Sequence, residues 1–296
     1  MRRSLIAFAP AVALLLAACG SSSGGSSSST PAASGSGSSS AASPSSTCSP
    51  TSLQTLTPNT FTVATGNPAF PPWVVDDKPE SGKGYEAAVT YAVAKQLGYT
   101  DAQVKWIRTT FDSAIAPGPK KFDVNIQQFS ISEDRKKAVD FSSGYYDLTQ
   151  AVVSYKGSPI EKATTVAALK DAKLGAQLGT TSLQAITDVI APSKKPSVFK
   201  DNATAVSALK NHQIDGLVVD LPTAFYISGA ELTDGLIVGQ LPNTADQKEQ
   251  LGFLLAKGSP LTQCVSQAVD ALRADGTLAK LQDQWLSASA GAPVLS

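Results

Sequence analysis

The chain has 296 residues, with 24 basic and 24 acidic side chains. This length allows one large domain or two ordinary ones, and the balanced charge gives no reason to expect nucleic acid or an acidic polymer as a partner. One histidine and two distant cysteines, Cys48 and Cys264, do not make a structural zinc site. We therefore expect no metal and no other cofactor.

Residues 1–18 are predicted to be an export signal peptide. Arg2 and Arg3 give the segment a positive start. Residues 5–16 form an apolar core that is too short to span a bilayer comfortably, and residues 16–19 form a cleavage site of small residues. The pattern resembles a bacterial lipobox, in which Cys19 is lipidated and becomes the first residue of the mature protein. The alternative is an ordinary signal peptide followed by an incidental cysteine.

Residues 19–48 are predicted to be a lipid-anchored linker. Residues 20–47 are almost all Ser, Gly, Ala and Pro without a charge, so they cannot bury enough apolar surface to order themselves. With Cys19 lipidated, Cys48 and Cys264 are an even pair in an oxidising compartment. We predict a disulfide between them; the alternative is two free buried thiols.

The folded body begins with a predicted strand at 61–65 and a loop at 66–73. Three prolines stiffen this loop, which holds Phe70 and Trp73 at its tip. Aromatic residues on such a loop are suited to lining a ligand pocket, although Trp73 could instead be a hydrophobic plug against the core. A helix over 84–97 and a second strand over 104–107 follow.

The central stretch, residues 122–146, is predicted to contain a strand that leads into a short helix. Phe122, Val124 and Ile126 alternate with polar residues, and Ser132 precedes two acidic residues as a helix N-cap would. Arg135 lies in this helix, where its planar guanidinium suits a carboxylate ligand. Alternatively, it pairs on a solvated helix with a neighbouring acid. The candidate partners are Glu133, Asp134 and Asp140.

Two further turns in the second half of the chain could hold a ligand. A strand over 174–177 runs into a turn at 179–182 that opens a helix, so Thr181 lies where free N–H groups could meet an anion, or where they are merely capped. A strand over 214–219 delivers Asp220 just before Pro222. Its carboxylate must face water, find a cation or cap the next helix.

The order of elements predicts an α/β fold with two lobes. The chain crosses into a second lobe near residue 151 and returns near 236–239. The predicted boundaries are 59–150 for the first part of lobe one, 151–241 for lobe two, and 242–296 for the return to lobe one with its C-terminal helices. Segments 121–128 and 213–220 both bring polar residues to the end of a strand, where open α/β sheets bind ligands.

A family resemblance rests on the central stretch. The motif comprises Ser130-Ile131-Ser132, Arg135, Val139-Asp140-Phe141-Ser142 and Tyr145-Tyr146. It resembles the extracytoplasmic solute-binding proteins of ABC importers that bind polar amino acids (family 3), and the likeness extends from about Phe61 to Trp285. It implies a periplasmic-binding-protein fold of type II, with two Rossmann-like lobes joined by a hinge of two crossings.

The resemblance also implies a set of ligand-binding residues. Arg135 and Ser130 of lobe one and Thr181 of lobe two would hold a carboxylate, and Asp220 an α-ammonium. The ligand side chain would lie between Phe70 and Phe111, with Asn67, Gln128 and Gln177 as selectors. Asn67 stands where the family often has Asp, which argues against a strongly cationic ligand. Gln128 departs from the family, which usually has Gly at this position, and a Gln side chain there would narrow the pocket. We expect a neutral polar amino acid.

These features predict a binding protein and not an enzyme. We expect an extracytoplasmic monomer, held at the cell membrane by lipid on Cys19, that serves the permease and ATPase subunits of an ABC importer. Two alternatives remain open. One is an enzyme on the same scaffold, such as a cyclohexadienyl dehydratase; the other is a tethered amino-acid sensor or adhesion module.

Overall fold

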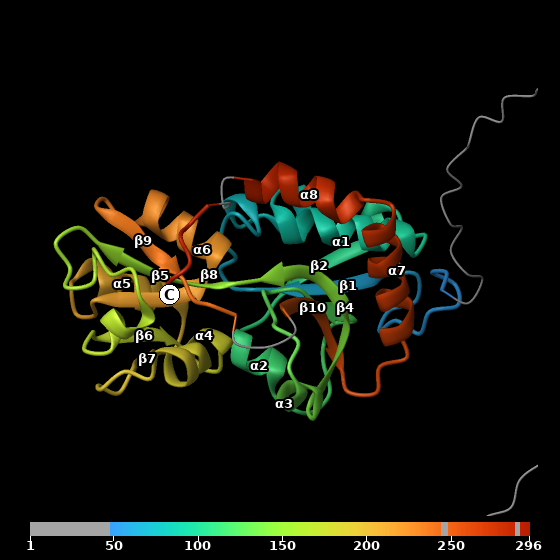
Figure 1. Cartoon of the computed structure of the whole chain (residues 1–296). Helices are drawn as coiled ribbons and strands as arrows, with labels where there is room; N and C mark the ends of the chain where they lie inside the picture. The colour runs from blue at the N-terminus through green and yellow to red at the C-terminus, as the bar shows by residue number, and fades with distance from the viewer. Residues whose placement is uncertain (1–47, 244–247, 288–290) are drawn as a thin grey trace, which may run out of the picture. The chain divides into compact units, whose positions relative to one another are not determined.

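The computed structural model of the protein describes residues 48–243, 248–287 and 291–296. The predicted signal peptide, Cys19 and the predicted linker up to residue 47 lie outside these ranges. Within them, the strands form two five-stranded mixed sheets, each covered by helices (Figure 1). We call the first sheet with its helices lobe one, and the second sheet with its helices lobe two.

The sheet of lobe one has the strand order β2-β1-β3-β10-β4. Its strands are β1 (Phe61–Thr65), β2 (Val104–Arg108), β3 (Val124–Asn125), β4 (Val139–Leu148) and β10 (Glu249–Ala256). β1 pairs in parallel with β2 and β3, whereas β10 runs antiparallel to β3 and β4. The parallel strands therefore deliver their carboxyl ends to one edge of the sheet, where the residues after them can meet.

Helices cover both faces of this sheet. One face packs against α1 (Tyr85–Gln96), α7 (Thr262–Ala274) and α8 (Thr277–Leu286), through a buried cluster that includes Phe61, Val63, Val89, Val265 and Val269. The other face packs against α2 (Phe111–Ile115), with α3 (Glu133–Lys136) close to β4. Apolar residues on both sides of the strands explain why β1 is buried along its whole length.

The sheet of lobe two has the strand order β7-β6-β8-β5-β9. Its strands are β5 (Gln150–Tyr155), β6 (Leu174–Gln177), β7 (Ser197–Phe199), β8 (Gly216–Asp220) and β9 (Gly235–Gln240). α5 (Asn202–Lys210) and α6 (Leu221–Tyr226) pack on one face, and α4 (Thr181–Ala185) with the π-turn after it packs on the other. β6 and β8 are parallel, so Gln177 and Asp220 end neighbouring strands at one edge.

The chain passes between the lobes twice. β4 ends at Leu148 and β5 begins at Gln150, while β9 ends at Gln240 and β10 begins at Glu249. Each passage joins a strand of one sheet to a strand of the other, as two crossings in a hinge require. The predicted two-lobed α/β fold is therefore confirmed.

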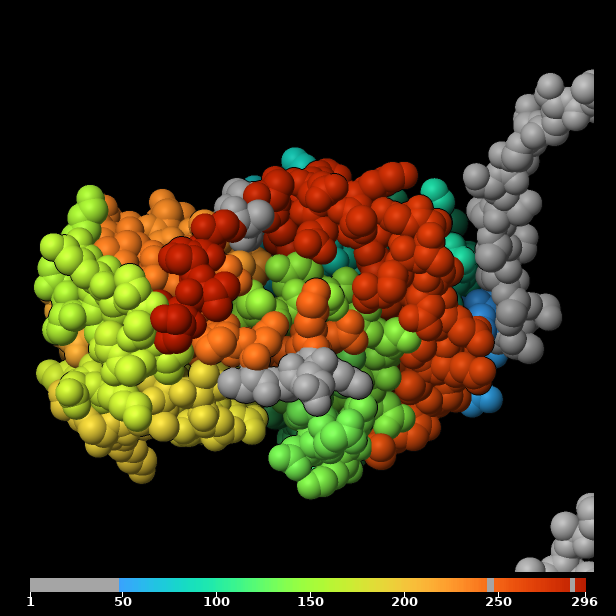
Figure 2. Space-filling view, viewed as in Figure 1, coloured from blue at the N-terminus to red at the C-terminus, as the bar shows by residue number. Residues whose placement is uncertain are grey.

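The C-terminal residues correct one predicted boundary. Residues 242–296 were predicted to belong to lobe one, but 291–296 lie on lobe two (Figure 2, dark red). Val294 forms a bridge with Gln240, whose N–H donates to the Pro293 carbonyl at 2.7 Å. Leu295, only 1% exposed, is buried in the apolar cluster of lobe two, and this burial draws the tail there.

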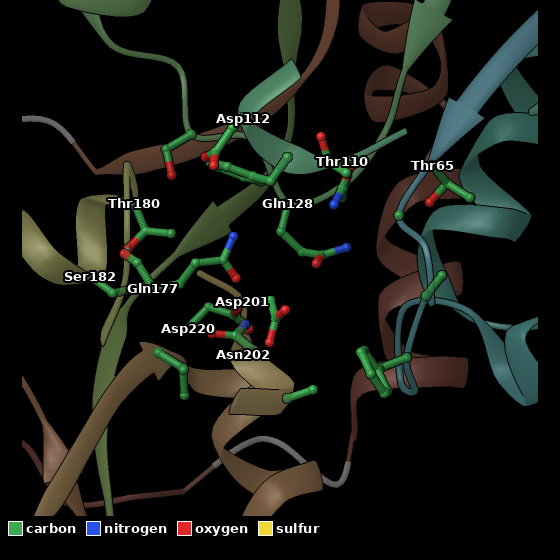
Figure 3. A pocket seen from close by; sticks show the side chains of 18 of the residues that line it. Thr65, Thr110, Asp112, Gln128, Gln177, Thr180, Ser182, Asp201, Asn202 and Asp220 are labelled. Atoms are coloured by element: carbon green, nitrogen blue, oxygen red, sulfur yellow. The ribbon is translucent and has the colours of Figure 1, made fainter. Parts of the chain in front are cut away.

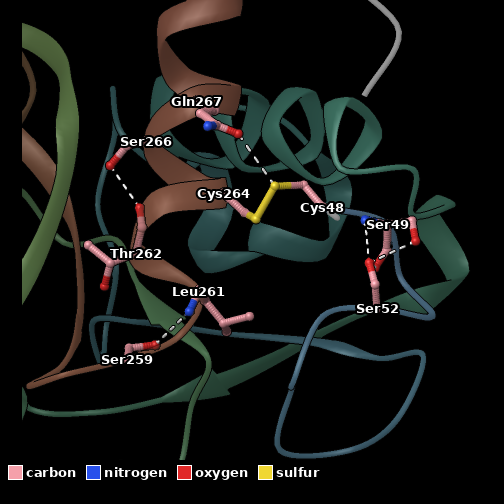
Figure 4. The surroundings of a disulfide bond; sticks show 9 residues. All are labelled: Cys48, Ser49, Ser52, Ser259, Leu261, Thr262, Cys264, Ser266 and Gln267. Carbon is pink, nitrogen blue, oxygen red and sulfur yellow. Dashed lines mark hydrogen bonds between the residues drawn. A yellow bond between two sulfur atoms is a disulfide. The ribbon is translucent and has the colours of Figure 1, made fainter. Parts of the chain in front are cut away.

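A disulfide joins Cys48 to Cys264, which confirms the predicted pair (Figure 4). The bond fastens the first described residue to α7 across 216 positions of sequence. None of the helices in the described ranges combines the length and apolar character needed to span a bilayer. The described part of the chain also holds no group of three or more His, Cys, Asp or Glu side chains placed to bind a metal ion.

Candidate ligand-binding cleft

A cavity of about 450 Å³ is lined by residues of both lobes. Figure 3 shows lobe-two residues such as Thr180 and Gln177 turned toward the same space as Gln128 of lobe one. The structure brings together all nine residues predicted from the sequence. They are Asn67, Phe70, Phe111, Gln128, Ser130, Arg135, Gln177, Thr181 and Asp220.

Arg135 lies where the strand-to-helix turn of the central stretch meets lobe two. The Ser132 hydroxyl accepts the Arg135 backbone N–H at 3.3 Å, as the predicted N-cap of α3 should. The guanidinium donates through Nη1 to the Ser130 carbonyl at 2.7 Å and through Nη2 to the Gly179 carbonyl of lobe two at 2.9 Å. Its Cζ lies 5.4 Å from the centre of the Phe111 ring, a cation–π contact.

The acids that could have neutralised Arg135 are engaged elsewhere. Glu133, Asp134 and Asp140 each pair with a lysine, at 2.8, 2.7 and 3.0 Å. Across the described residues Arg135 itself has no salt bridge, and burial lowers the pKa of its guanidinium while the charge of Glu249 opposes that shift. The cavity wall therefore contains a partly desolvated cation that lacks a carboxylate partner.

Hydroxyl and amide groups surround this cation at the junction between the lobes. The Ser130 and Thr181 hydroxyl oxygens lie 3.1 Å apart across the lobes. Gln150, at the start of β5, donates to Thr181 Oγ1 at 3.3 Å and accepts from the Ser182 hydroxyl at 2.8 Å. Gln150 was not singled out in the sequence, because nothing in its local pattern distinguishes it from an ordinary strand residue.

Asp220 ends β8 and caps α6. Its Oδ1 accepts the Thr223 N–H at 2.8 Å, so the predicted capping role is present. Burial raises the pKa of the Asp220 carboxyl to about 6; its hydrogen bonds with Thr223 oppose the shift and the charge of Glu249 adds to it. Within the described ranges no lysine or arginine forms a salt bridge with Asp220.

A second carboxylate that sequence reasoning missed lies behind Gln128. Glu86 of α1 is 0% exposed and accepts hydrogen bonds from the Tyr145 hydroxyl, the Gln128 side-chain amide and, at 2.8 Å, the Gln128 backbone N–H. Burial raises its pKa to about 7 against the effect of these hydrogen bonds, and the charge of Asp220 adds to the increase. Its position was detectable, because Glu86 shares a helical face with the buried Val89 and Val93.

Gln128 is held in an unusual conformation by these contacts. Its backbone φ is +51°, a left-handed value that favours glycine, the residue that the family resemblance led us to expect at this position. The side chain lines the cavity, but its amide nitrogen is already bound to Glu86. Its part in selecting a ligand stays a prediction.

Aromatic residues line the cavity from lobe one. Phe70 is 36% exposed, and its ring centre lies 6.5 Å from that of Tyr226 of lobe two. Phe111 stacks on Phe129 at 4.9 Å. Trp73 is only 2% exposed and donates from its indole to the Thr223 hydroxyl at 2.9 Å, so it is a buried residue that also links the lobes.

Among the described residues that line the cavity, Arg135 is a cation without a salt bridge, and Asp112 and Asp220 are acids without one; hydroxyl and amide groups are also part of the lining. Such a wall is complementary to a small ligand that has a carboxylate and an ammonium group.

The chain resembles known amino acid-binding proteins. Residues 61–288 match the family model of bacterial extracellular solute-binding proteins, family 3. ABC transporter arginine-binding protein 1 of Escherichia coli (strain K12) is 30% identical over 207 residues, which are 68% of this chain and 81% of the relative.

Two solved structures are also similar. An ancestral arginine-binding protein bound to glutamine has a TM-score of 0.63 and 33% identity, over 77% of this chain and 97% of its own. An ancestral amino acid-binding protein, a precursor of cyclohexadienyl dehydratase, has a TM-score of 0.62 and 31% identity, over 77% of this chain and 95% of its own. These likenesses confirm the predicted type II periplasmic-binding-protein fold. The chain belongs to the bacterial extracellular solute-binding proteins, family 3.

Proposed function

We propose that the protein is the extracytoplasmic substrate-binding lipoprotein of an ABC importer. It binds a polar amino acid between its two lobes and delivers it to the permease, whose ATPase subunits drive uptake. Membership of a solute-binding family supports this proposal, as does the naming of similar proteins as amino acid-binding proteins of ABC transporters.

One observation carries the proposal: Arg135 of lobe one and Asp220 of lobe two line the same cavity, and neither has a protein partner of opposite charge among the described residues. Leaving a charge unpaired in a partly desolvated site is costly. An α-amino acid removes both costs at once, since its carboxylate pairs with the guanidinium and its ammonium with the carboxylate.

The contacts between the lobes explain how a ligand would favour the closed form. Arg135 already reaches the Gly179 carbonyl, and Ser130 meets Thr181, at the place proposed for the ligand carboxylate. A carboxylate bound there touches both lobes and therefore has a higher affinity for the closed form than for an open one. The permease can then distinguish loaded from empty protein by its closure.

A thermal-shift panel of the common amino acids on the mature protein tests the proposal. We expect at least one polar amino acid to raise the melting temperature in a concentration-dependent way. For that amino acid, Arg135→Ala should weaken binding by about 2–5 kcal/mol in calorimetry, because a desolvated carboxylate is left unpaired. Lys136→Ala, on the same helix but outside the cavity lining, is the matched control and should bind normally. A loss below about tenfold in Arg135→Ala contradicts the assignment.

The lipid anchor is part of the same proposal and is supported by the lipobox-like residues before Cys19. Cys19→Ser should release the protein from the membrane fraction while leaving amino-acid binding unchanged. Equal membrane retention of both proteins contradicts the anchor.

One observation favours an enzyme as the second candidate. A carboxyl whose pKa is raised to about 6, as in Asp220, could donate a proton near neutral pH, as a dehydratase requires. An assay of prephenate turnover separates the two functions. The binding proposal predicts no turnover by the wild-type protein, whereas turnover that disappears in Asp220→Asn establishes the enzyme.

A further inference from the structure

One buried glutamine at the hinge contacts the proposed carboxylate site. Gln150 is the first residue of β5, directly after the first crossing between the lobes, and it is 7% exposed. Its backbone lies opposite Asp220 in the antiparallel pair of β5 and β8. Residues opposite each other in such a pair point to the same face of the sheet, and both of these line the cavity.

The side-chain amide of Gln150 is fully engaged. Its Nε2 donates to Glu249 Oε2 at 3.1 Å and to Thr181 Oγ1 at 3.3 Å. Its Oε1 accepts from the Ser182 hydroxyl at 2.8 Å. A primary amide has two N–H donors, so both of them are used here. The Gln150 amide is therefore held in one orientation by three contacts.

Glu249 determines which way this amide faces. It is the first residue of β10, where the second crossing ends, so its bond with Gln150 joins the two crossings of the hinge. An ionised carboxylate can only accept hydrogen bonds, and so it requires the NH₂ group of the amide and not the carbonyl oxygen. With the amide in this orientation, its other N–H faces Thr181 and its oxygen faces Ser182.

The orientation of the amide decides what the Thr181 hydroxyl can do. A hydroxyl that accepts a hydrogen bond from Gln150 keeps its own proton for a different acceptor. The Ser130 hydroxyl oxygen lies 3.1 Å away and can take this proton, but a ligand carboxylate held by Arg135 is a stronger acceptor. If the amide were turned the other way, its oxygen would draw the Thr181 proton away from the ligand.

We propose that Gln150 is a positioning residue of the carboxylate site: oriented by Glu249, it directs the proton of the Thr181 hydroxyl toward the ligand carboxylate. Gln150 acts through Thr181 and does not need to touch the ligand. The inference rests on the proposed amino-acid binding, and it assigns a role to a residue outside the predicted ligand contacts.

A double-mutant cycle on the full mature chain tests this role, by calorimetry with the common L-amino acid that gives the largest thermal shift. Gln150→Met keeps the length of the side chain but removes both donors, so it should weaken binding by about tenfold or more. Thr181→Val removes the hydroxyl and should have a similar effect. The protein with both changes should bind within about twofold of Thr181→Val, because Gln150 acts through that hydroxyl. Gln184→Met, an exposed change on α4 outside the cavity lining, is the matched control and should bind normally.

Exchanging the two hinge side chains separates positioning from a structural role. Gln150→Glu combined with Glu249→Gln keeps one amide and one carboxylate in contact, so the melting temperature should stay close to that of the wild-type protein. A carboxylate at residue 150 can only accept from Thr181, so amino-acid binding should be at least about tenfold weaker. In a Thr181→Val background the exchange should change the affinity by less than about twofold, which excludes simple charge repulsion as the cause.

The possible failures are distinguishable. If folded Gln150→Met binds normally, or if the two single losses multiply in the double variant, the positioning proposal is overturned and the proposed function stands. A loss of less than about tenfold in the exchanged pair overturns it equally, since Gln150 then only closes the hinge with Glu249. If Gln150→Met does not fold, the exchanged pair decides alone. If no common amino acid binds the wild-type protein, the proposed function is overturned and this proposal with it.

Discussion

Amino-acid binding by this protein should weaken as the pH falls from about 7 to about 5, because Asp220 takes up a proton. Burial places the pKa of Asp220 at about 6 in the ligand-free cleft. The ligand's ammonium stays charged over this range, so a proton on Asp220 competes directly with it. The protonated fraction rises from about one tenth at pH 7 to about nine tenths at pH 5, which predicts an affinity loss of about tenfold, or 1.4 kcal/mol.

The sign of the effect follows from which form binds. Only the ionised carboxylate attracts the ammonium, so full affinity is present above the pKa and is lost as the pH falls through it. Calorimetry at several pH values measures this profile. Asp220→Asn should bind more weakly throughout and lose most of the slope. Glu86 titrates in the wild-type protein and in Asp220→Asn alike. The contribution of Asp220 is therefore the difference between the two profiles of affinity against pH. A flat wild-type profile, or the same slope in Asp220→Asn, refutes the reasoning.

Three further predictions concern stability. Glu86 has a pKa of about 7 in the folded protein, against 4.5 for an unperturbed glutamate side chain. Its contribution to stability is therefore fully present below about pH 4.5 and is lost as the pH rises through 7. The unfolding free energy should fall by about 3 kcal/mol over this range. Glu86→Gln should therefore raise the unfolding free energy in urea at about pH 8 and not at about pH 4.5; an equal effect at both values contradicts the buried charge. Gln128→Gly relieves about 1 kcal/mol of left-handed backbone strain. It also removes the side-chain hydrogen bond to the buried Glu86 carboxylate, a bond that contributes about 1.5–3 kcal/mol, so the unfolding free energy in urea at about pH 8 should fall. Reducing the Cys48–Cys264 bond should lower the unfolding free energy by about 2–5 kcal/mol, and identical urea midpoints with and without reductant would count against this.

Short sequence patterns predicted those parts of the site whose structure depends on residues close together in the chain. The alternation in Phe122, Val124 and Ile126 identified the strand before the central turn, and Ser132 identified the cap that places Arg135. Asp220 shows that two interpretations can hold together, since it caps α6 and also lines the cavity. Because these features depend on residues within a few positions of one another, the sequence displays them directly.

Contacts between distant segments were not predictable in the same way. Trp73 meets Thr223 across 150 positions, and the engagement of Glu86 by Gln128 depends on how α1 packs behind the central turn. The C-terminal tail was assigned to the wrong lobe because residues 291–296 have no periodic pattern, and only the apolar cluster that buries Leu295 determines where they lie.

The central claim is that Arg135 and Asp220 hold the two ends of a zwitterion. Its most direct test is the affinity of wild-type and Asp220→Asn protein for the amino acid that gives the largest thermal shift and for its deaminated analogue. The wild-type protein should prefer the amino acid by at least about tenfold, a difference of about 1.4 kcal/mol or more, and Asp220→Asn should lose most of that preference. If the substitution weakens both ligands equally, Asp220 does not hold the ammonium and the account is contradicted.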